Sequence, residues 1–407
     1  LFGFLAPLVA SEPSESTSEE TGIVDELIQF DPPIEGKRYL FSDSEVPIFS
    51  ATTYLKKQWI EDGYPGLILP FSPSYQNSRH SARSCEDAWA VDDTDNITTT
   101  DGTISATVER ISANAAIFVE DGKVISSTTL NDISSTWESI IYPTDTNYFG
   151  GSPDVDNNCQ IEIIIYSIDG LGGVGGYFQP GISSLRESLF VDIDDLSGRN
   201  SILSYELEHL IHNAWDPFEY IWIDEGAAGM ATYLCFGVDS ELTGNSNAWS
   251  VNSSISLRWW NDRDSDHGAS FLFMLYLADK LGGAPSIRSL VADTSLGGVG
   301  IENLARNPGT GSTLIGDTMS EIFANFSAAV TLDSSQEPFG FSNLELVDDC
   351  SSGGICKARD SESNSQWTEA WQSQGHSVEG WGLRSFKFTQ GTGDPLTLMV
   401  QPDRFGF

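Results

Sequence analysis

Apolar and polar residues alternate along the chain between about residues 84 and 170. Residues 103–112 and 115–119 follow this pattern, and Asp121 and Gly122 then mark a turn. A period of two is typical of strands that bury one face. Residues 161–168 are almost continuously apolar, which predicts a strand covered on both faces. This part of the chain is therefore expected to form a sheet.

A helical period replaces the alternation after about residue 200. Helices are predicted at 203–213, 223–236 and 269–281, with further helical segments at 134–141, 286–292 and 320–329. The glycine-rich stretch 170–176 lies before the first of the long helices, lacks a phosphate-binding spacing, and is predicted to be a flexible loop. Strands followed by helices place the chain in the α+β class.

The pattern divides the chain into four parts. Residues 1–22 form an apolar and then acidic, serine-rich tail, and residues 23–83 form an ordered segment to which the sequence gives no role. The main domain is predicted to span residues 84–334. Residues 335–407 change to loops and short strands, notably 385–389 and 396–400, and are expected to form a small C-terminal β-domain.

Charge excludes some classes of partner. The 407 residues carry a formal net charge of −39, which repels nucleic acid and anionic membranes. No segment is long and apolar enough to span a membrane. The short apolar run at residues 1–10 resembles the end of a signal peptide, so secretion is expected. The tail at 1–22 is a candidate contact with neighbouring subunits.

The five cysteines lack the spacing of a thiolate metal site. Cys350 and Cys356 flank a flexible stretch that can close into a small disulfide loop, and Cys85 with Cys159 is a second candidate pair. Cys235 lies in an apolar helical run and is expected to be a free thiol. Such disulfides agree with an oxidising, extracellular location.

The chemistry concentrates in one helix and the helix that follows it. A zinc-peptidase helix reads His-Glu-x-x-His: two imidazoles one turn apart bind the metal, and the glutamate acts as general base. Here Tyr205 stands in the first histidine position, and Glu206 and His209 keep the rest of the motif. Glu225 follows in Trp-Ile-Asp-Glu-Gly-Ala, far enough along for a turn and a return helix.

In combination these motifs resemble the gluzincin metallopeptidases, specifically the secreted hyicolysin-like group. That group usually reads His-Glu-Phe-Gln-His and then Trp-x-Asn-Glu-Gly-x-Ala. The resemblance covers roughly residues 103–285, including 140–143, 154–158, 176–178 and 268–273. It implies a gluzincin fold, in which the edge strand of a mixed sheet receives an extended polypeptide substrate above the metal helix.

The resemblance also implies roles for individual residues. Glu225 matches the third zinc ligand, His209 the second and Glu206 the general base. Tyr205 stands in place of the histidine that would be the first ligand. A phenol binds zinc poorly at neutral pH, because its pKa is near 10. His267 is a candidate for the missing imidazole or for an oxyanion-stabilising group, against the alternative of an exposed loop histidine.

Two further positions complete the candidates. His212 lies on the same face of the predicted helix as His209 and is either a substitute ligand or a packed histidine. Asp154, Asp156 and Asn158 have the alternating oxygen spacing of a calcium loop, without the glutamate that completes an EF-hand. They indicate either a partial calcium site or an acidic turn.

Two functions follow from these features. The first is a secreted metallopeptidase homologue whose zinc site is impaired and which serves as an extracellular structural or assembly subunit. The second is an active zinc endopeptidase that uses Glu206 as general base with an unusual ligand set. Tyr205 favours the first function, and the joint presence of Glu206, His209 and Glu225 favours the second.

Overall fold

The computed structural model describes residues 48–63, 85, 88–170, 173–181, 186–307, 314–358 and 381–383. It divides into two compact units. We call Pro32–Gly237 with Ala284–Leu296 the sheet unit, and Val238–Gly283 with Gly297–Phe407 the helical unit. The division at Gly237 falls inside the range predicted as one domain, 84–334. The predicted tail, 1–22, and the C-terminal strands lie outside the described residues, so those boundaries stay predictions.

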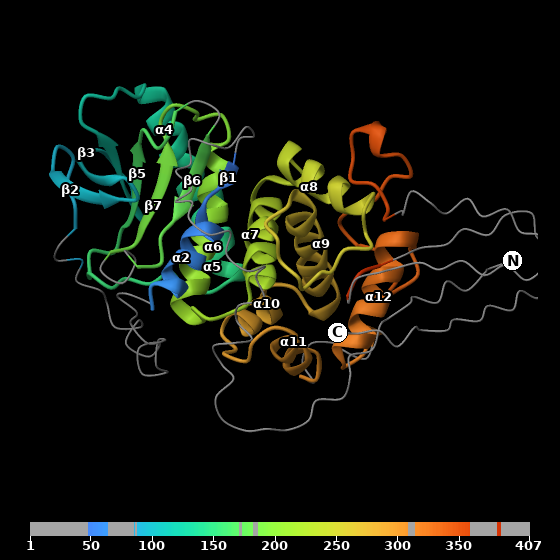
Figure 1. Cartoon of the computed structure of the whole chain (residues 1–407). Helices are drawn as coiled ribbons and strands as arrows, with labels where there is room; N and C mark the ends of the chain where they lie inside the picture. Colours follow the sequence, from blue (N-terminus) through green and yellow to red (C-terminus); the bar gives the residue numbers. More distant parts are fainter. Residues whose placement is uncertain are drawn as a thin grey trace, which may run out of the picture. The chain divides into compact units, whose positions relative to one another are not determined.

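The sheet unit is built on a seven-stranded mixed sheet in the order β1-β6-β7-β5-β4-β3-β2 (Figure 1). β4, β5 and β7 run parallel to one another, β6 runs antiparallel to β7, and β1 runs parallel to β6. The strands are β1 Ile48–Ser50, β2 Thr94–Thr99, β3 Gly102–Ile111, β4 Ala115–Glu120, β5 Ile161–Tyr166, β6 Val174–Phe178 and β7 Ser188–Asp192. The mixed sheet confirms the α+β class.

The centre of the sheet is covered on both faces. Every residue of β5 and β7 is buried, as the continuous apolar run at 161–168 predicted. Ile164, Phe118 and Phe190 belong to one hydrophobic cluster, to which Leu55 of α2 contributes. Because side chains alternate along a strand, Ile163 and its neighbours pack on the opposite face.

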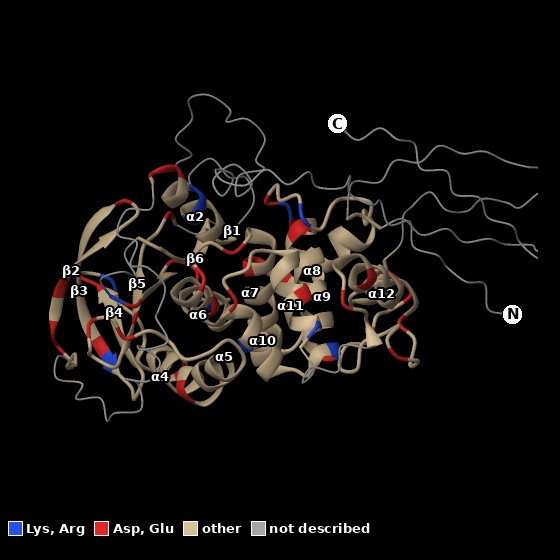
Figure 2. Ribbon diagram, turned by 90° about the horizontal axis from the view of Figure 1, so that it is seen from below, with Lys and Arg blue, Asp and Glu red and all other residues tan. Residues whose placement is uncertain are grey.

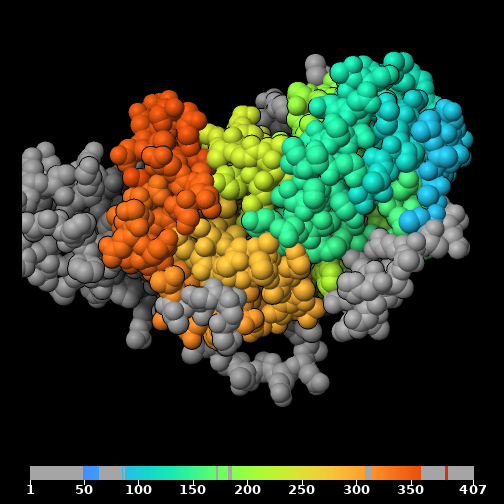
Figure 3. Space-filling view, turned by 180° about the vertical axis from the view of Figure 1, so that it is seen from behind, coloured from blue at the N-terminus to red at the C-terminus, as the bar shows by residue number. Residues whose placement is uncertain are grey.

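The sheet unit also contains helices, some of which pack against the sheet. They are α2 Thr52–Glu61, α4 Ser127–Thr136, the π-helical turn η2 Trp137–Ile141, α5 Tyr142–Tyr148, α6 Arg199–Trp215, α7 Ile221–Phe236 and α10 Ala284–Val291. α6 packs against β6 and β7, while α4 packs against β3 and β4. The space-filling view shows the segment from α4 to α5 at the surface of this unit (Figure 3). The predicted helices at 134–141, 203–213, 223–236 and 286–292 are confirmed. Residues 134–141 belong to α4 and η2, and the other three ranges correspond to α6, α7 and α10 with limits that differ by a few residues.

The glycine-rich stretch corrects one prediction. Residues 174–176 are not loop but the first part of strand β6. A Cβ atom at Gly176 would lie 2.6 Å from the carbonyl oxygen of Phe190 and 2.5 Å from Ile202 of α6. The glycines therefore let α6 approach the sheet closely. Only spatial neighbours that are distant in the sequence reveal this use of glycine.

A second correction concerns residues 23–83, to which the sequence assigned no role. Their described part, residues 48–63, supplies β1 and the amphipathic helix α2. Ile48 pairs with Val174 and Ser50 with Gly176, and the Ala51 N–H donates to the Gly176 carbonyl at 3.0 Å. The segment thus lies along β6, which would otherwise be the edge of the sheet.

The helical unit contains α8 Ser240–Ser250, α9 Asp264–Leu281, α11 Gly298–Ala305, α12 Met319–Leu332 and the short 3₁₀ helix η4 Cys350–Ser352. α9 packs against α8, and Trp249 stacks on Phe326 of α12. α9 ends at Leu281, and Gly282 caps it in the left-handed conformation. Among described residues 335–358 the structure contains one isolated β-bridge, Val347 with Cys356, and no strand.

Both predicted disulfides are present, Cys85–Cys159 and Cys350–Cys356. Cys235 is a free, half-buried thiol. Acidic side chains predominate over basic ones along the described ribbon (Figure 2). Of the described helices, none has both the length and the apolar character needed to cross a bilayer.

Candidate metal centre

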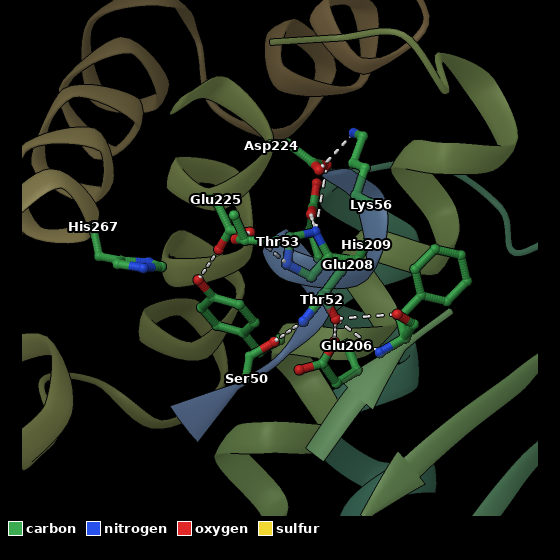
Figure 4. A network of polar contacts seen from close by, with 12 residues as sticks. Ser50, Thr52, Thr53, Lys56, Glu206, Glu208, His209, Asp224, Glu225 and His267 are labelled. Carbon is green, nitrogen blue, oxygen red and sulfur yellow. Dashed lines mark hydrogen bonds and ion pairs between the residues drawn. The ribbon is translucent and has the colours of Figure 1, made fainter. Parts of the chain in front are cut away.

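Helices α6 and α7 bring the three predicted ligands together. The rings of Tyr205 and His209 meet edge to face with their centroids 5.1 Å apart. The Tyr205 hydroxyl donates to Glu225 Oε2, and His209 Nε2 lies 3.6 Å from Glu225 Oε1 (Figure 4). Each of the three is at most 6% exposed. A turn after α6 reverses the chain, so that α7 places Glu225 beside Tyr205 and His209 of α6.

Glu206, the predicted general base, is fully buried on the same helix. The Thr52 hydroxyl donates to Glu206 Oε2 at 2.5 Å and accepts from the Phe178 N–H at 2.8 Å. Burial raises the pKa of Glu206 to about 7, although His209 and the hydroxyls of Ser50 and Thr52 oppose the shift. A carboxyl group with a pKa near neutrality can exchange a proton at physiological pH.

A buried network of charges lies beside these groups. Lys56 of α2 forms an ion pair with Asp224 of α7 at 2.7 Å. Asp224 Oδ1 is also 3.4 Å from His209 Nδ1 and 3.3 Å from His212 Nδ1. His212 Nδ1 lies 3.0 Å from Glu208 Oε1. All five side chains are at most 3% exposed, so each charge depends on the others for compensation.

The pKa values in this network follow from that mutual compensation. Burial alone would lower the pKa of His209, but the charges of Asp224 and Glu225 outweigh it and raise the pKa well above its ordinary value. Burial would also lower the pKa of His212, but the charge of Glu208 outweighs it and raises that pKa to about 9. Burial would raise the pKa of Asp224, but Lys56 and the two imidazoles hold it far below its usual range.

The acids of this network stand at informative positions. Glu208 and Asp224 occupy positions where the usual pattern of the resembling group has Gln and Asn. At these two positions this chain therefore has carboxylates in place of amides. Lys56 and His212 supply the opposite charge. This network was not predicted from the sequence. Its signal was the pair of amide-to-acid differences on either side of the motif.

The segment β1–α2 contacts three residues of the predicted constellation, namely Tyr205, Glu206 and Glu225. The ring of Phe49 meets Tyr205 at 5.3 Å, Thr52 donates to Glu206, and Thr53 donates to Glu225 Oε1. Figure 4 shows the side chains of Thr52 and Thr53 directed from the first turn of α2 toward α6 and α7. No local motif marks these residues. Only the pairing of β1 with β6 brings them to the site.

The donors fit zinc in kind. An imidazole nitrogen, a carboxylate and a phenol oxygen converge, and neither ring nitrogen of His209 has a hydrogen-bond partner among the described residues. The fit is incomplete in one respect. Hydroxyl groups of Tyr205 and Thr53 already donate to the two carboxylate oxygens of Glu225. Bound zinc would lower the pKa of a coordinated water and so supply the nucleophile for hydrolysis.

A second set of donors overlaps the first. Glu208, His209 and Asp224 place ligand atoms within 4.8 Å of one another, which makes them a possible metal-binding group. The ammonium group of Lys56, however, already occupies one oxygen of Asp224. A second cation beside Lys56 would be repelled, which weighs against this group as a metal site. Tyr205, His209 and Glu225 stay the predicted zinc ligands.

His212 and His267 lie in different settings. His212 is packed inside the sheet unit and bonded to Glu208, as expected for a packed histidine. His267 lies in α9 of the helical unit, where its Nε2 is 3.2 Å from Asp262 Oδ1 and its ring contacts Trp260. Its assignment to the metal centre stays a prediction.

Comparison with known proteins supports the same chemistry. No family model matches the chain. The chain is similar to the neutral metalloprotease ShpI of Staphylococcus hyicus, at 26% identity over 200 residues. This similarity covers 40% of the chain and 45% of the relative, so the chain spans under half of that protein's length. The likeness supports a metallopeptidase relationship.

Proposed function

We propose that this chain is a metallopeptidase homologue with an impaired zinc site that serves as an extracellular structural or assembly subunit. One observation carries the proposal: residues 48–50 of the same chain pair with β6, and the hydroxyl groups of Thr52 and Thr53 donate hydrogen bonds to Glu206 and Glu225. The resemblance assigns the sheet edge to substrate. An incoming extended polypeptide would have to displace β1 before it could pair with β6.

Tyr205 supports impairment independently. As a ligand the phenol would have to lose a proton whose pKa is ordinarily near 10, whereas as a donor it stabilises the buried Glu225 carboxylate. The carboxylates Glu208 and Asp224 with Lys56 and His212 balance charge in this region without an ion. The two disulfides support an oxidising extracellular location.

The alternative, an active zinc endopeptidase, keeps one specific support. Burial raises the pKa of Glu206 to about 7, which suits a general base at neutral pH. In that case Tyr205, His209 and Glu225 would hold the zinc, and Glu206 would accept the proton. The segment β1–α2 would then have to leave β6 before a polypeptide substrate could bind.

Zinc content and casein hydrolysis together separate the two functions. We expect the natively purified chain to hold far less than one zinc per molecule and to cleave casein no faster than its Glu206→Gln variant. Tyr205→His should bring zinc content close to one per chain. One zinc per unmodified chain, with hydrolysis that Glu206→Gln abolishes, would instead establish the endopeptidase.

A second comparison isolates the contribution of β1. In the Tyr205→His background, Ala51→Pro removes the N–H that donates to Gly176 and should weaken the pairing of β1 with β6. Ala51→Ser keeps that N–H and serves as the control. We expect casein hydrolysis to rise only with Ala51→Pro. Equal hydrolysis by both zinc-loaded variants would show that β1 does not obstruct the substrate edge.

The assembly role has its own test. The full chain has a mass of 44.3 kDa, and light scattering coupled to size-exclusion chromatography should detect a larger particle. Deletion of residues 1–22 should reduce that particle if the tail provides the contact. A particle of monomer mass at all concentrations would contradict assembly between copies of this chain.

A further inference from the structure

A second group of carboxylates lies away from the zinc candidates, at the loop that precedes β5. Asp154 and Asp156 come from this loop, and Glu187 directly precedes β7. One oxygen of each carboxylate lies within 4.8 Å of the others. Three acidic groups that close together repel one another unless a cation or protons compensate their charge.

The loop holds its two aspartates in fixed positions. The Cys159 N–H donates to Asp154 Oδ1 at 3.1 Å, and the Asn158 N–H donates to Asp156 Oδ1 at 3.2 Å. The disulfide between Cys85 and Cys159 anchors the end of the loop. The two carboxylates are thus arranged before any ligand binds.

Glu187 provides the observation that points to a ligand. Its side chain is only 1% exposed, and its Oε2 has no hydrogen-bond partner among the described residues. Its Oε1 accepts from the Val155 N–H. A buried carboxylate oxygen without a partner is costly, and such groups usually mark an ion or a proton that balances them.

No cationic side chain of the described residues pairs with Asp156 or Glu187. The neighbouring cation, Arg186, forms ion pairs with Glu162 and with Asp95, the latter at 2.7 Å. Burial raises the pKa of Glu187 to about 8, and Asp156 and Asp154 add to the shift. Burial also raises the pKa of Asp156 to about 6. Asp156 and Glu187 therefore have little charge compensation from the described residues.

We infer that Asp154, Asp156 and Glu187 bind a calcium ion. Three carboxylates from a preformed loop and strand suit a hard divalent cation, and calcium accepts six to eight oxygen ligands in flexible geometry, with waters completing the set. This proposal differs in its third member from the calcium site predicted from Asp154, Asp156 and Asn158, which stays untested. The Asn158 amide nitrogen donates to Asp156, and its oxygen accepts from the Gln160 N–H. Its amide is thus engaged within the loop, and Glu187 takes the third place.

Such an ion would connect the loop before β5 to the start of β7. These strands are paired, with Glu162 opposite Ser188. The bound ion would therefore stabilise the sheet unit against unfolding rather than take part in chemistry at the zinc candidates. This role does not depend on whether Tyr205, His209 and Glu225 bind zinc.

Thermal unfolding of the full chain tests the site. After dialysis against EGTA, calcium added to about 100 times its dissociation constant should raise the Tm by about 5–10 °C. The same addition should leave the Tm of Glu187→Gln unchanged. Glu109→Gln, which removes an exposed charge on β3, is the matched control and should respond like the unmodified chain.

Terbium luminescence gives a second readout on the unmodified chain. Terbium should bind and calcium should displace it, and Asp156→Asn should weaken both by at least tenfold. This measurement holds even if Glu187→Gln fails to fold. No calcium effect on the Tm together with no terbium binding would overturn the inference. So would an equal rise in Tm for the unmodified chain and the Glu187 and Asp156 variants.

Discussion

Tyr205 places a hydrogen-bond donor where a zinc-peptidase helix would place an imidazole. Its hydroxyl donates to Glu225, its ring packs between His209 and Phe49, and its side chain is 6% exposed. A phenol in this position satisfies a buried carboxylate without an ion. In this structure Tyr205 therefore acts as a hydrogen-bond donor to Glu225.

Tyr205→Phe tests this role. The variant keeps the ring but leaves Glu225 with one donor fewer, so the free energy of unfolding should fall by about 1–3 kcal/mol, as urea denaturation at pH 7 would measure. Tyr148→Phe, on the half-buried end of α5, should change it by less than about 0.5 kcal/mol. Zinc content should be unaffected. Unchanged stability together with a loss of bound zinc would show that the phenol is a ligand.

Asp145 is a buried acid outside the metal centre. It is fully buried, accepts from the Cys235 thiol at 3.5 Å, and has one oxygen without a hydrogen bond among the described residues. Burial raises its pKa well above the ordinary value of 3.8. The folded state therefore favours the protonated carboxyl, and stability is lost as pH rises above 3.8 toward the raised pKa.

Asp145→Asn should remove this loss. We expect the variant to gain about 1–3 kcal/mol in the free energy of unfolding at pH 8 and to differ little from the parent at pH 4. Urea denaturation across this pH range gives the comparison, with Asp62→Asn at the exposed end of α2 as control. A gain in stability that does not grow with pH would contradict the raised pKa of Asp145.

At the scale of elements, the N-terminal segment matters most. β1 extends the sheet beyond β6, and α2 then reaches α6 and α7 through Thr52, Thr53 and Lys56. The glycines of β6 let α6 approach the sheet from its other side. The candidate metal centre is therefore enclosed by elements that lie about 150 residues apart in the chain.

Lys56→Met tests how firmly α2 is held. The variant leaves Asp224 without its ammonium partner in a buried environment, and we expect a loss of about 3 kcal/mol in the free energy of unfolding. Lys57→Met, at the next position of α2, removes the same formal charge and should cost less. Adding Asp224→Asn to Lys56→Met should recover part of the loss, since the unpaired charge disappears. Additive losses would indicate that the two residues are not coupled.

At the scale of the whole molecule, acidity dominates. The chain has a net charge of −39, with 59 acidic residues against 20 Lys and Arg, and acidic positions recur along the described ribbon (Figure 2). Like charges across a folded surface repel one another, and dissolved salt screens them at about 10 Å in 0.1 M solution. The folded chain should therefore depend on ionic strength more than a neutral protein does.

Sodium chloride is expected to stabilise the protein. Raising its concentration from 0.05 M to 1 M, with EGTA present to remove divalent ions, should increase the Tm by about 5 °C through screening. A neutral osmolyte at matched osmolality controls for excluded-volume effects. A Tm that is unchanged or lower in salt would mean that ion pairs such as Lys56 with Asp224 outweigh the general repulsion.

The sequence by itself determined the elements with strong local patterns. The period of two and the apolar run gave β3, β4 and β5, and the helical period gave α6, α7 and α9, because local burial fixes such patterns. The motif spacing also brought Tyr205, Glu206, His209 and Glu225 to one site. Cysteine spacing indicated both disulfides.

Only the tertiary structure decided what surrounds these residues. The pairing of β1 with β6, the approach of Thr52 and Thr53 to the glutamates, and the place of Glu187 beside Asp154 and Asp156 all join distant parts of the chain. A one-dimensional pattern records the periodicity that an element needs for burial. It does not record which distant polar group will compensate a buried charge, because that depends on how the elements pack.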